Sequence, residues 1–431
     1  SMKLQRTKAP ASKEIKRLSF EKAKKQILKN GIELYSITVG EQEILKIDFI
    51  FSAGEWYQTT PLVSASTIQM LQEGGALYSA DNIAEKIDFM GSYIYFNASK
   101  HTATITAYTL VKYFEETIKI LEDVIKNPQF PEEKFKTYVA KRQQLYTLER
   151  EKVEVMAQKK FVQVVFGTQH PYGISHEPEE FLNLTVSHLK KFHAHFYNSN
   201  NCKIVMSGKI KSEQQAIVAH YFGDAAWNVH KSVITLPDYV IEPSEQKSHF
   251  VEKTDAIQSA VRVGKLLVNK YNPDYSSLQV LNTILGGYFG SRLMSNIRED
   301  KGYTYGIGSG IVSHKNAGYF VIVSQVGTNV CKQALNEIYY ELKRLRTETI
   351  PDSEIQTVKN YMKAAIARNF DGPFALSESF KTILEYDLGY KYYMQFWKKI
   401  DKISASELKY LANTYLNEDS MYEIIVGGNP K

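Results

Sequence analysis

The sequence predicts an α+β protein made of two duplicated domains, each a mostly antiparallel sheet packed with helices. Two observations carry this prediction. Strand-like and helix-like segments are mixed along the chain rather than strictly alternating, and the order of segments in the first half returns in the second. With 431 residues, 43% of them hydrophobic and 23% charged, the chain is long enough for two domains of about 200 residues.

The repeat is visible as matching positions at a nearly constant spacing. Near the end of each half, Leu189 matches Leu408 and Gly208 matches Gly427, a spacing of 219 residues. The expected domains are a basic N-terminal arm at 1–20, an N-terminal domain at 21–228, a linker at 229–246 and a C-terminal domain at 247–431.

Local patterns justify the first-half elements in order. Asn30-Gly31 between two alternating runs is typical of a β-hairpin, and Ser79 is a good N-cap for a helix that ends at Gly91. The expected strands are Gln26–Val39 (as a hairpin), Ile44–Ala53, Tyr93–Ala98, Thr102–Thr109 and Cys202–Ser207. The expected helices are Pro61–Glu73, Ser79–Met90, Lys112–Lys126, Glu132–Val165 and Val186–Tyr197.

The most informative stretch is Gly286–Gly310, GGYFGSRLMSNIREDKGYTYGIGSG. After its first glycines it has a short helical pattern at Arg292–Glu299, a turn, and an alternating run at Tyr303–Gly310 that is typical of a strand. This helix-turn-strand unit can hold one Arg and one Tyr toward the same side.

Arg298 and Tyr305 are seven residues apart across the turn, so both can face one ligand. A guanidinium and a phenol are common tools for binding a carboxylate or a polarised carbonyl oxygen. On the residues alone an alternative stays open, in which Arg298 pairs with Glu299 or Asp300 and Tyr305 is a core aromatic.

The run SRLMSNIREDKGYTYGIGSG resembles the second-half motif of insulinase/pitrilysin-like zinc peptidases, S-R-L-x-x-x-[LIV]-R-E-x-x-G-x-x-Y. The resemblance covers essentially the whole chain after the basic arm and implies the same two-domain layout. It also implies that Arg298 and Tyr305 reach a zinc site and hold the substrate, with the zinc bound in the other half or in another subunit.

The zinc half lacks a zinc motif. A catalytic zinc needs two imidazoles one helical turn apart, a carboxylate base and a distant third ligand. In the family the first three are H-x-x-E-H, and at those positions this chain has Ala65, Ile68 and Gln69. The family's third ligand is a Glu on a later helix, and the corresponding segment, Lys141–Gln144, contains no acid.

The ten histidines offer no replacement site. His188, His193 and His195 crowd one expected helix without a Glu in the family's spacing, so they are expected to be surface residues and one core histidine. His101 stands at the edge of a strand, and His170 belongs to HPYG, a turn that the family also has and that is expected to be structural. We expect no metal and no cofactor in this chain, with zinc in a partner subunit.

The intact Arg/Tyr pair and the missing zinc motif are together typical of one kind of subunit in this family. The resemblance implies a non-catalytic subunit of a heterodimeric zinc peptidase, which is not an enzyme on its own. Its partner would be a paralogue that carries H-x-x-E-H. Arg298 and Tyr305 would act in trans, binding the peptide substrate and stabilising the scissile carbonyl at the partner's zinc.

Three alternatives stay open. The chain can be a non-proteolytic scaffold, like the family's core subunits in respiratory complexes, although a scaffold has no need of the Arg/Tyr pair. It can be a peptide-binding subunit like the glycine-rich partner of the mitochondrial processing peptidase, although Gly286–Gly290 is much shorter than that loop. It can also bind nucleic acid through its basic arm.

Charge and composition bound the remaining classes. The net charge of +6 is a property of the arm, because residues 1–30 hold ten Lys or Arg and two Glu, while the remainder is slightly acidic. No nucleic-acid-binding motif accompanies the arm, so no nucleic-acid partner is expected. No apolar run has the length of a membrane span and no secretory signal is visible, so we expect a cytoplasmic protein without a membrane partner.

Overall fold

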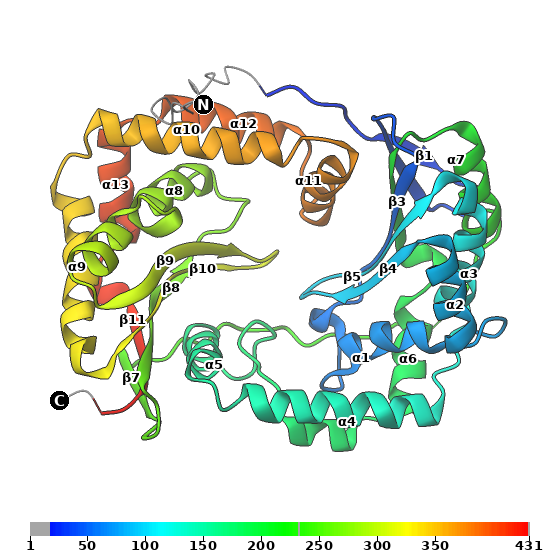
Figure 1. Ribbon diagram of the computed structural model, residues 1–431, viewed down its shortest axis with the longest axis horizontal. Helices are drawn as coiled ribbons and strands as arrows, with labels where there is room; N and C mark the ends of the chain where they lie inside the picture. Colours follow the sequence, from blue (N-terminus) through cyan, green and yellow to red (C-terminus); the bar gives the residue numbers. More distant parts are fainter. Residues whose placement is uncertain (1–17, 232, 430–431) are drawn as a thin grey trace, which may run out of the picture.

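The computed structural model describes residues 18–231 and 233–429, which form two similar halves facing each other (Figure 1). Each half contains one β-sheet with most of its helices on the outer side. Most of the arm expected at 1–20 lies outside the described residues. In the part of the chain that is described, no helix is both long and apolar enough to cross a bilayer.

The first half carries a six-stranded sheet of order β1-β2-β6-β3-β5-β4. Its strands are β1 (Lys24–Ile27), β2 (Glu33–Thr38), β3 (Ile44–Phe51), β4 (Tyr93–Ala98), β5 (Ala103–Leu110) and β6 (Cys202–Gly208). Its helices are α1 (Val63–Met70), α2 (Ala80–Met90), α3 (Phe114–Lys126), α4 (Glu132–Glu149), α5 (Val153–Phe166), α6 (Val186–Phe196) and α7 (Ser212–Val218).

The second half carries a five-stranded sheet of order β7-β11-β8-β10-β9. Its strands are β7 (Ser248–Glu252), β8 (Gln258–Leu267), β9 (Thr304–Ser313), β10 (Gly318–Gly327) and β11 (Tyr422–Gly427). Its helices are α8 (Tyr275–Asn282), the π-helical turns η7 (Thr283–Gly287) and η8 (Met294–Asp300), α9 (Cys331–Thr347), α10 (Asp352–Arg368), α11 (Pro373–Glu385), α12 (Lys391–Lys402) and α13 (Ala405–Tyr415).

The two strand orders are the same once β1 is set aside. β2 and β6 form the parallel pair of the first sheet, β7 and β11 form that of the second, and every other pair is antiparallel. The predicted α+β class with two duplicated, mostly antiparallel sheets is therefore confirmed. Because the repeat holds residue by residue along the strands, positions in one half can be matched to positions in the other.

Two helices cross from one half to the other. α5 belongs to the first half in sequence but packs Ala157 and Phe161 against Tyr319 of the second sheet. In return α11 packs Phe380 against Tyr35 of the first sheet. Figure 1 shows these two helices on opposite sides of the central region, each beside the sheet of the other half. Each sheet thus has, on its inner face, one helix that comes from the other half of the sequence. We call these two helices, α5 and α11, the borrowed helices.

The crossing explains one wrong prediction. The single helix expected at Glu132–Val165 is two helices, because the chain breaks between Arg150 and Lys152. Neither Gly nor Pro marks this break, and Arg150 is held there by an ion pair to Glu179 at 2.9 Å. The turn is needed because α5 has to leave the direction of α4 to reach the second sheet.

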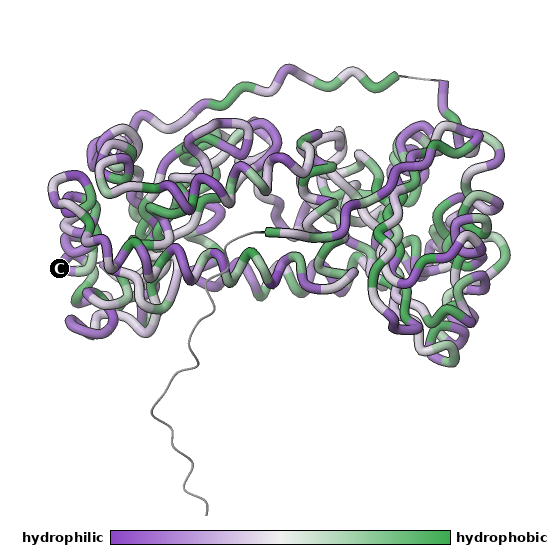
Figure 2. The backbone as a smooth tube through the Cα atoms, turned by 90° about the horizontal axis from the view of Figure 1, so that it is seen from above, coloured by the Kyte–Doolittle hydropathy of each residue, from purple (hydrophilic) through white to green (hydrophobic). Residues whose placement is uncertain are grey.

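An extended segment that contains the expected linker runs along one side of the molecule from the first half to the second (Figure 2). It packs on α5, where the backbone N–H of Glu242 donates to the Phe166 carbonyl at 3.1 Å. Tyr239 meets Trp56 of the first half edge to face, with ring centroids 4.9 Å apart. On β11 of the second half, the Tyr422 hydroxyl donates to the Ser244 carbonyl at 2.5 Å, so the segment is tied to both halves.

Candidate functional site

Helix α1 carries Ala65, Ile68 and Gln69, the three positions that the sequence resemblance matches to the family's zinc motif. Ile68 is fully buried in the apolar core of the first half. The Gln69 amide donates a hydrogen bond to the carbonyl of Phe96 at 2.7 Å, which ties α1 to the edge strand β4. Ala65 is partly buried and has no donor atom. The side chains at these positions are therefore a methyl group, a core hydrocarbon and an amide already engaged in the fold.

The segment expected to supply the third ligand does lie close to α1. The hydroxyls of Ser66 on α1 and Tyr138 on α4 are 3.1 Å apart, and Lys141–Gln144 follows within about one turn. Within that segment the Gln143 amide donates to the Pro178 carbonyl at 3.3 Å. The two segments meet as the resemblance implies, but amides and cations stand where a zinc site needs acids and imidazoles.

Among the described residues, no group of three or more His, Cys, Asp or Glu is placed to hold a metal ion. The histidines of α6 have separate environments. Burial lowers the pKa of His193 to about 4, and its Nε2 lies 2.7 Å from the Ile125 carbonyl oxygen. His188 accepts a hydrogen bond from the Thr185 N–H at the start of its own helix. These contacts are those of structural histidines.

The second-half motif folds as a helical turn followed by the edge strand β9. A β-bulge interrupts the pairing of β9 with β10, since Thr304 faces Val326 and Ile307 faces Ser324, with one extra residue between them on β9. The Ser324 hydroxyl donates to the Gly306 carbonyl at 2.9 Å and holds the bulge in place. The extra residue lets Ile307 enter the outer core while Tyr305 stays on the inner face.

Tyr305 and Arg298 have different surroundings. Tyr305 is 90% exposed, so the alternative that it is a core aromatic is wrong. The Arg298 guanidinium lies over the Phe289 ring at 5.4 Å from the ring centroid. In the described chain it has no ion pair with Glu299 or Asp300, and Asp300 pairs with its neighbour Lys301 instead. No hydrogen bond among the described residues joins Arg298 to Tyr305.

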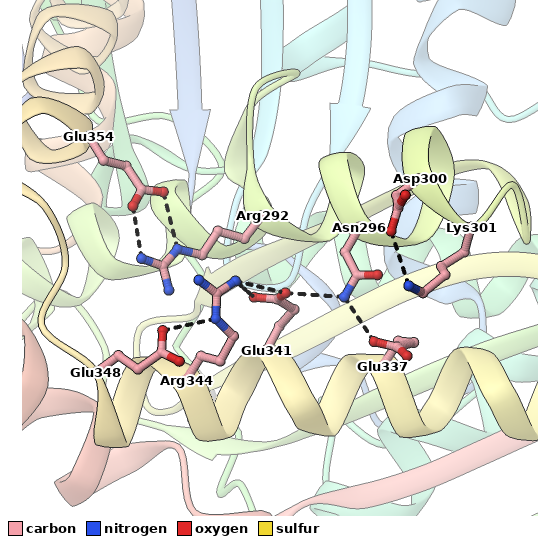
Figure 3. A network of polar contacts seen from close by, with 9 residues as sticks. All are labelled: Arg292, Asn296, Asp300, Lys301, Glu337, Glu341, Arg344, Glu348 and Glu354. Carbon is pink, nitrogen blue, oxygen red and sulfur yellow. Dashed lines mark hydrogen bonds and ion pairs between the residues drawn. The ribbon is translucent and has the colours of Figure 1, made fainter.

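The other arginine of the motif is structural. Arg292 is 9% exposed and grips Glu354 of α10 with two hydrogen bonds, Nε to Oε2 at 3.1 Å and Nη2 to Oε1 at 2.8 Å (Figure 3). On the next turn the Asn296 amide donates to both Glu337 and Glu341 of α9 at 3.0 and 3.1 Å. These bonds fix the helical turn that carries Arg298 and precedes Tyr305.

Tyr305 lines a pocket of about 330 Å³ on the inner face of the second sheet. The other lining residues come from β8, β9, β10 and the first turn of α5; they are Glu154, Gln258, Ala260, Val261, Arg262, Thr304, Gly306, Val323, Ser324 and Gln325. Sequence reasoning missed Arg262, because an arginine inside a strand gives no signal of its own until the neighbouring strands and helices are known.

At the matching positions of the first half, charged side chains form ion pairs with one another. Lys46 and Asp48 on the inner face of β3 are fully buried, and α11 places Glu378 and Lys381 over them. The distances are 3.3 Å for Lys46–Asp48, 2.5 Å for Lys46–Glu378 and 2.9 Å for Lys381–Asp48. Burial raises the pKa of Glu378, but the two lysines outweigh it and hold that pKa below its usual range. We call these four residues the charge quartet.

The HPYG turn lies at the junction between the halves. The Tyr172 hydroxyl contacts Nε2 of His101 and accepts a hydrogen bond from the Asn316 N–H at 3.2 Å. The ring of His314, from the β9–β10 hairpin, stacks on Tyr172 at 4.3 Å. His170 accepts a hydrogen bond from the Tyr172 N–H at 3.1 Å. The turn is structural, and it joins the first half to the tip of the second sheet.

Comparison with known proteins agrees with this geometry. Residues 183–362 match a family described as the peptidase M16 inactive domain. The chain is also similar to the uncharacterized zinc protease YmxG of Bacillus subtilis (strain 168), with 22% identity over 358 residues, 82% of this chain and 83% of that protein. The matched part of the chain, residues 183–362, is therefore similar to an M16 peptidase domain.

The similarity includes M16 proteins whose names mark them as inactive. The non-peptidase homolog YmxG of Helicobacter pylori (strain ATCC 700392 / 26695) is 24% identical over 344 residues, 70% of this chain and 75% of that protein. The crystal structure of the peptidase M16 inactive domain from Pseudomonas fluorescens superposes with a TM-score of 0.80 at 23% identity, over 94% of this chain and 98% of that one. The resemblance to insulinase/pitrilysin-like peptidases is confirmed, and the matched family model, the Helicobacter relative and the Pseudomonas structure all carry names that mark them as inactive.

Proposed function

We propose that this chain is the non-catalytic subunit of a heterodimeric zinc peptidase, and that it supplies Arg298 and Tyr305 to the site formed with its partner. The partner is a paralogue that carries H-x-x-E-H and binds the zinc. The observation that carries the proposal is the position of Tyr305, 90% exposed at a held bulge on an inner sheet face, in a chain with Ala65, Ile68 and Gln69 at the zinc positions.

An exposed phenol on a rigid strand suits hydrogen bonding to a peptide carbonyl. Tyr305 makes no hydrogen bond within the described chain, so its hydroxyl is available to a ligand, and the Thr304 and Ser324 hydroxyls hold the backbone on either side of it. Donors held in place before the reaction stabilise developing negative charge without reorganising. Arg298 adds a guanidinium that lies over the Phe289 ring, on a helical turn that Arg292 holds against α10.

Steady-state kinetics of the chain reconstituted with its H-x-x-E-H paralogue test this proposal. Tyr305→Phe is expected to lower kcat roughly tenfold to thousandfold, the range found when one oxyanion donor is removed. Arg298→Ala is expected to raise KM as well, because a guanidinium can also bind a ground-state carbonyl. The chain alone is the baseline and is expected to cleave no peptide.

Two matched variants separate this role from a structural one. Tyr410→Phe removes a phenol that is 67% exposed on α13 and should leave kcat unchanged. Arg292→Ala breaks the paired contact with Glu354 and should lower the melting temperature, whereas Arg298→Ala should not. Normal kcat for Tyr305→Phe in an assembled heterodimer would contradict the proposal and leave a scaffold or peptide-binding subunit of the same fold.

A further inference from the structure

Among the described residues, Arg262 makes no ion pair or hydrogen bond, although Asp48, the matching residue of the first half, makes several. The register of the strands places Arg262 beside Ile424 and Asp48 beside Val205, and these neighbours match at the repeat spacing of 219 residues. Arg262 therefore occupies the place of Asp48, on the inner sheet face under the borrowed helix. Where Asp48 has two lysines, Arg262 makes no hydrogen bond or ion pair with any described residue.

The helix over Arg262 does not supply an acid. At the spacing of 220 residues that relates α5 to α11, Glu378 is replaced by Gln158 and Lys381 by Phe161. Burial lowers the pKa of Arg262, and the group that acts in the opposite direction is the Tyr319 phenol rather than a carboxylate. Its Nε is buried without an acceptor, while its terminal nitrogens are open to solvent. An unpaired, partly buried cation is costly, so its presence calls for an anionic ligand.

The surroundings of Arg262 leave room for such a ligand. Its pocket also offers the side-chain amides of Gln258 and Gln325 and the hydroxyl of Tyr305. Beside the pocket the inner face of β9 is bare, since a Cβ at Gly306 or Gly310 would have no atom within 4 Å. The only acid of the lining, Glu154, is exposed and makes no ion pair with Arg262.

We propose that this pocket binds a carboxylate of a peptide, with the Arg262 guanidinium as its counter-charge and the bare face of β9 as the surface for the peptide main chain. A planar guanidinium matches a carboxylate in geometry and can form two parallel hydrogen bonds with it. The carboxylate can belong to the peptide C-terminus or to an Asp or Glu side chain. The inference rests on the proposed function only in taking a peptide as the ligand, and it requires neither zinc nor the partner.

Fluorescence anisotropy of the full chain alone, with labelled hexapeptide pools of mixed sequence, tests the proposal. The first pool has a free C-terminal carboxylate and no acidic residue. The second is C-terminally amidated with one Glu, and the third is amidated with no acid. We expect the first or the second pool to bind about tenfold more tightly than the third, and the preferred pool identifies the source of the carboxylate.

Variants assign the effect to Arg262. Arg262→Gln should abolish the preference for the acidic pools, and Arg262→Lys should keep a smaller part of it because charge remains without the planar fork. Lys332→Gln makes the same change of charge on the exposed outer face of α9 and should leave the preference intact. Circular dichroism confirms that each variant is folded.

Three outcomes would overturn the inference: no binding of any pool at millimolar concentration, equal affinity for all three pools, or a preference that survives Arg262→Gln. None of these decides the kinetics of Tyr305→Phe in the heterodimer. In the same way, a normal kcat in that experiment leaves the carboxylate preference of the isolated chain untouched, so the two proposals fail separately.

Discussion

Lys46 and Asp48 occupy the inner-face positions of the first sheet where the second sheet has Ala260 and Arg262. In the first half, Glu378 and Lys381 of the borrowed helix α11 form ion pairs with Lys46 and Asp48. In the second half the borrowed helix α5 packs through Phe161 and Ala157 instead.

The edge strands β4 and β9 also differ in the size of the side chains on their inner faces. On the inner face of β4 the first half places Tyr95, which is 56% exposed, and Asn97, whereas Gly308 and Gly310 take the matching positions on β9. At these matched positions the first half thus has paired charges and an aromatic ring, and the second has a cation that is unpaired among the described residues, beside Tyr305. The first inner face has a pocket of its own next to the charge quartet, about 590 Å³ in volume and lined in part by Glu378 and Lys381.

The largest effect that would sharpen this comparison concerns the charge quartet. Asp48→Ala leaves Lys46 and Lys381 short of a buried counter-charge and should lower the free energy of unfolding by about 3 kcal/mol or more, because breaking a buried ion pair on one side strands the other charge. Arg262→Met, at the matching position, should change it by about 1 kcal/mol or less in either direction, since no ion pair is lost and the apolar stem is kept.

The measurement is thermal or denaturant unfolding of both variants beside the wild type. Asp48→Asn is a useful intermediate, because it removes the charge but keeps the size and the hydrogen bond from Thr106. If Arg262→Met lowered the free energy of unfolding as much as Asp48→Ala does, Arg262 would have stabilising contacts comparable to those of Asp48, and the comparison would fail.

A smaller effect is expected from pH at the junction between the halves. Burial, with help from Lys315 and Lys100, lowers the pKa of His101 from 6.5 to about 4, and burial with Lys100 and His170 does the same for His314. The unfolded chain therefore takes up protons below pH 6.5 that the folded chain refuses until about pH 4. This stability is present above pH 6.5 and is lost as the pH falls toward 4.

At pH 5 the loss should be roughly 1 kcal/mol for each of these two histidines, after allowance for partial solvent screening. His314→Phe keeps a ring on Tyr172 but removes the titration, so its melting temperature should depend less on pH between 7 and 5. His220→Phe changes an exposed histidine on the outside of the first half and should keep the wild-type dependence. An unchanged slope for His314→Phe would show that the junction is not the acid-sensitive element.

The sequence was sufficient for much of the frame and for only part of the site. The hairpin at Asn30-Gly31 and the helix capped by Ser79 are encoded by local signals, and both are present, with Gly31 at φ 95° and the Ser79 hydroxyl accepting from the Asn82 N–H at 3.2 Å. The break at Arg150–Lys152 had no such signal, because residues of good helix propensity continue through it and the packing of α5 on the other half decides.

Within the site, the motif predicted the helical turn that carries Arg298 and the strand that carries Tyr305, since residue types at fixed spacing carry that information. It could not reveal that Arg292 rather than Arg298 makes the buried ion pair, because Glu354 lies 62 residues away in sequence. Arg262 was invisible for the same reason. Arg262 stands out because α5 places no acidic side chain against it, and only the folded structure shows which helix covers this strand.

The smallest expected effect concerns the bare face of β9. Gly306 lines the Arg262 pocket and Gly310 does not, yet a Cβ added at either position would have open space around it. Neither glycine has the positive φ that disfavours a side chain, so Gly306→Ala and Gly310→Ala should each raise the free energy of unfolding by up to about 1 kcal/mol, chiefly by restricting the unfolded chain. A methyl group at 306 or 310 intrudes on the surface proposed for the peptide main chain, and we expect each variant to have a few-fold weaker affinity for the acidic hexapeptide pools. Gly389→Ala, at an exposed glycine outside the sheet, should bind as the wild type does. Wild-type affinity for Gly306→Ala and Gly310→Ala would move the peptide off this strand, even if Arg262 still holds its carboxylate.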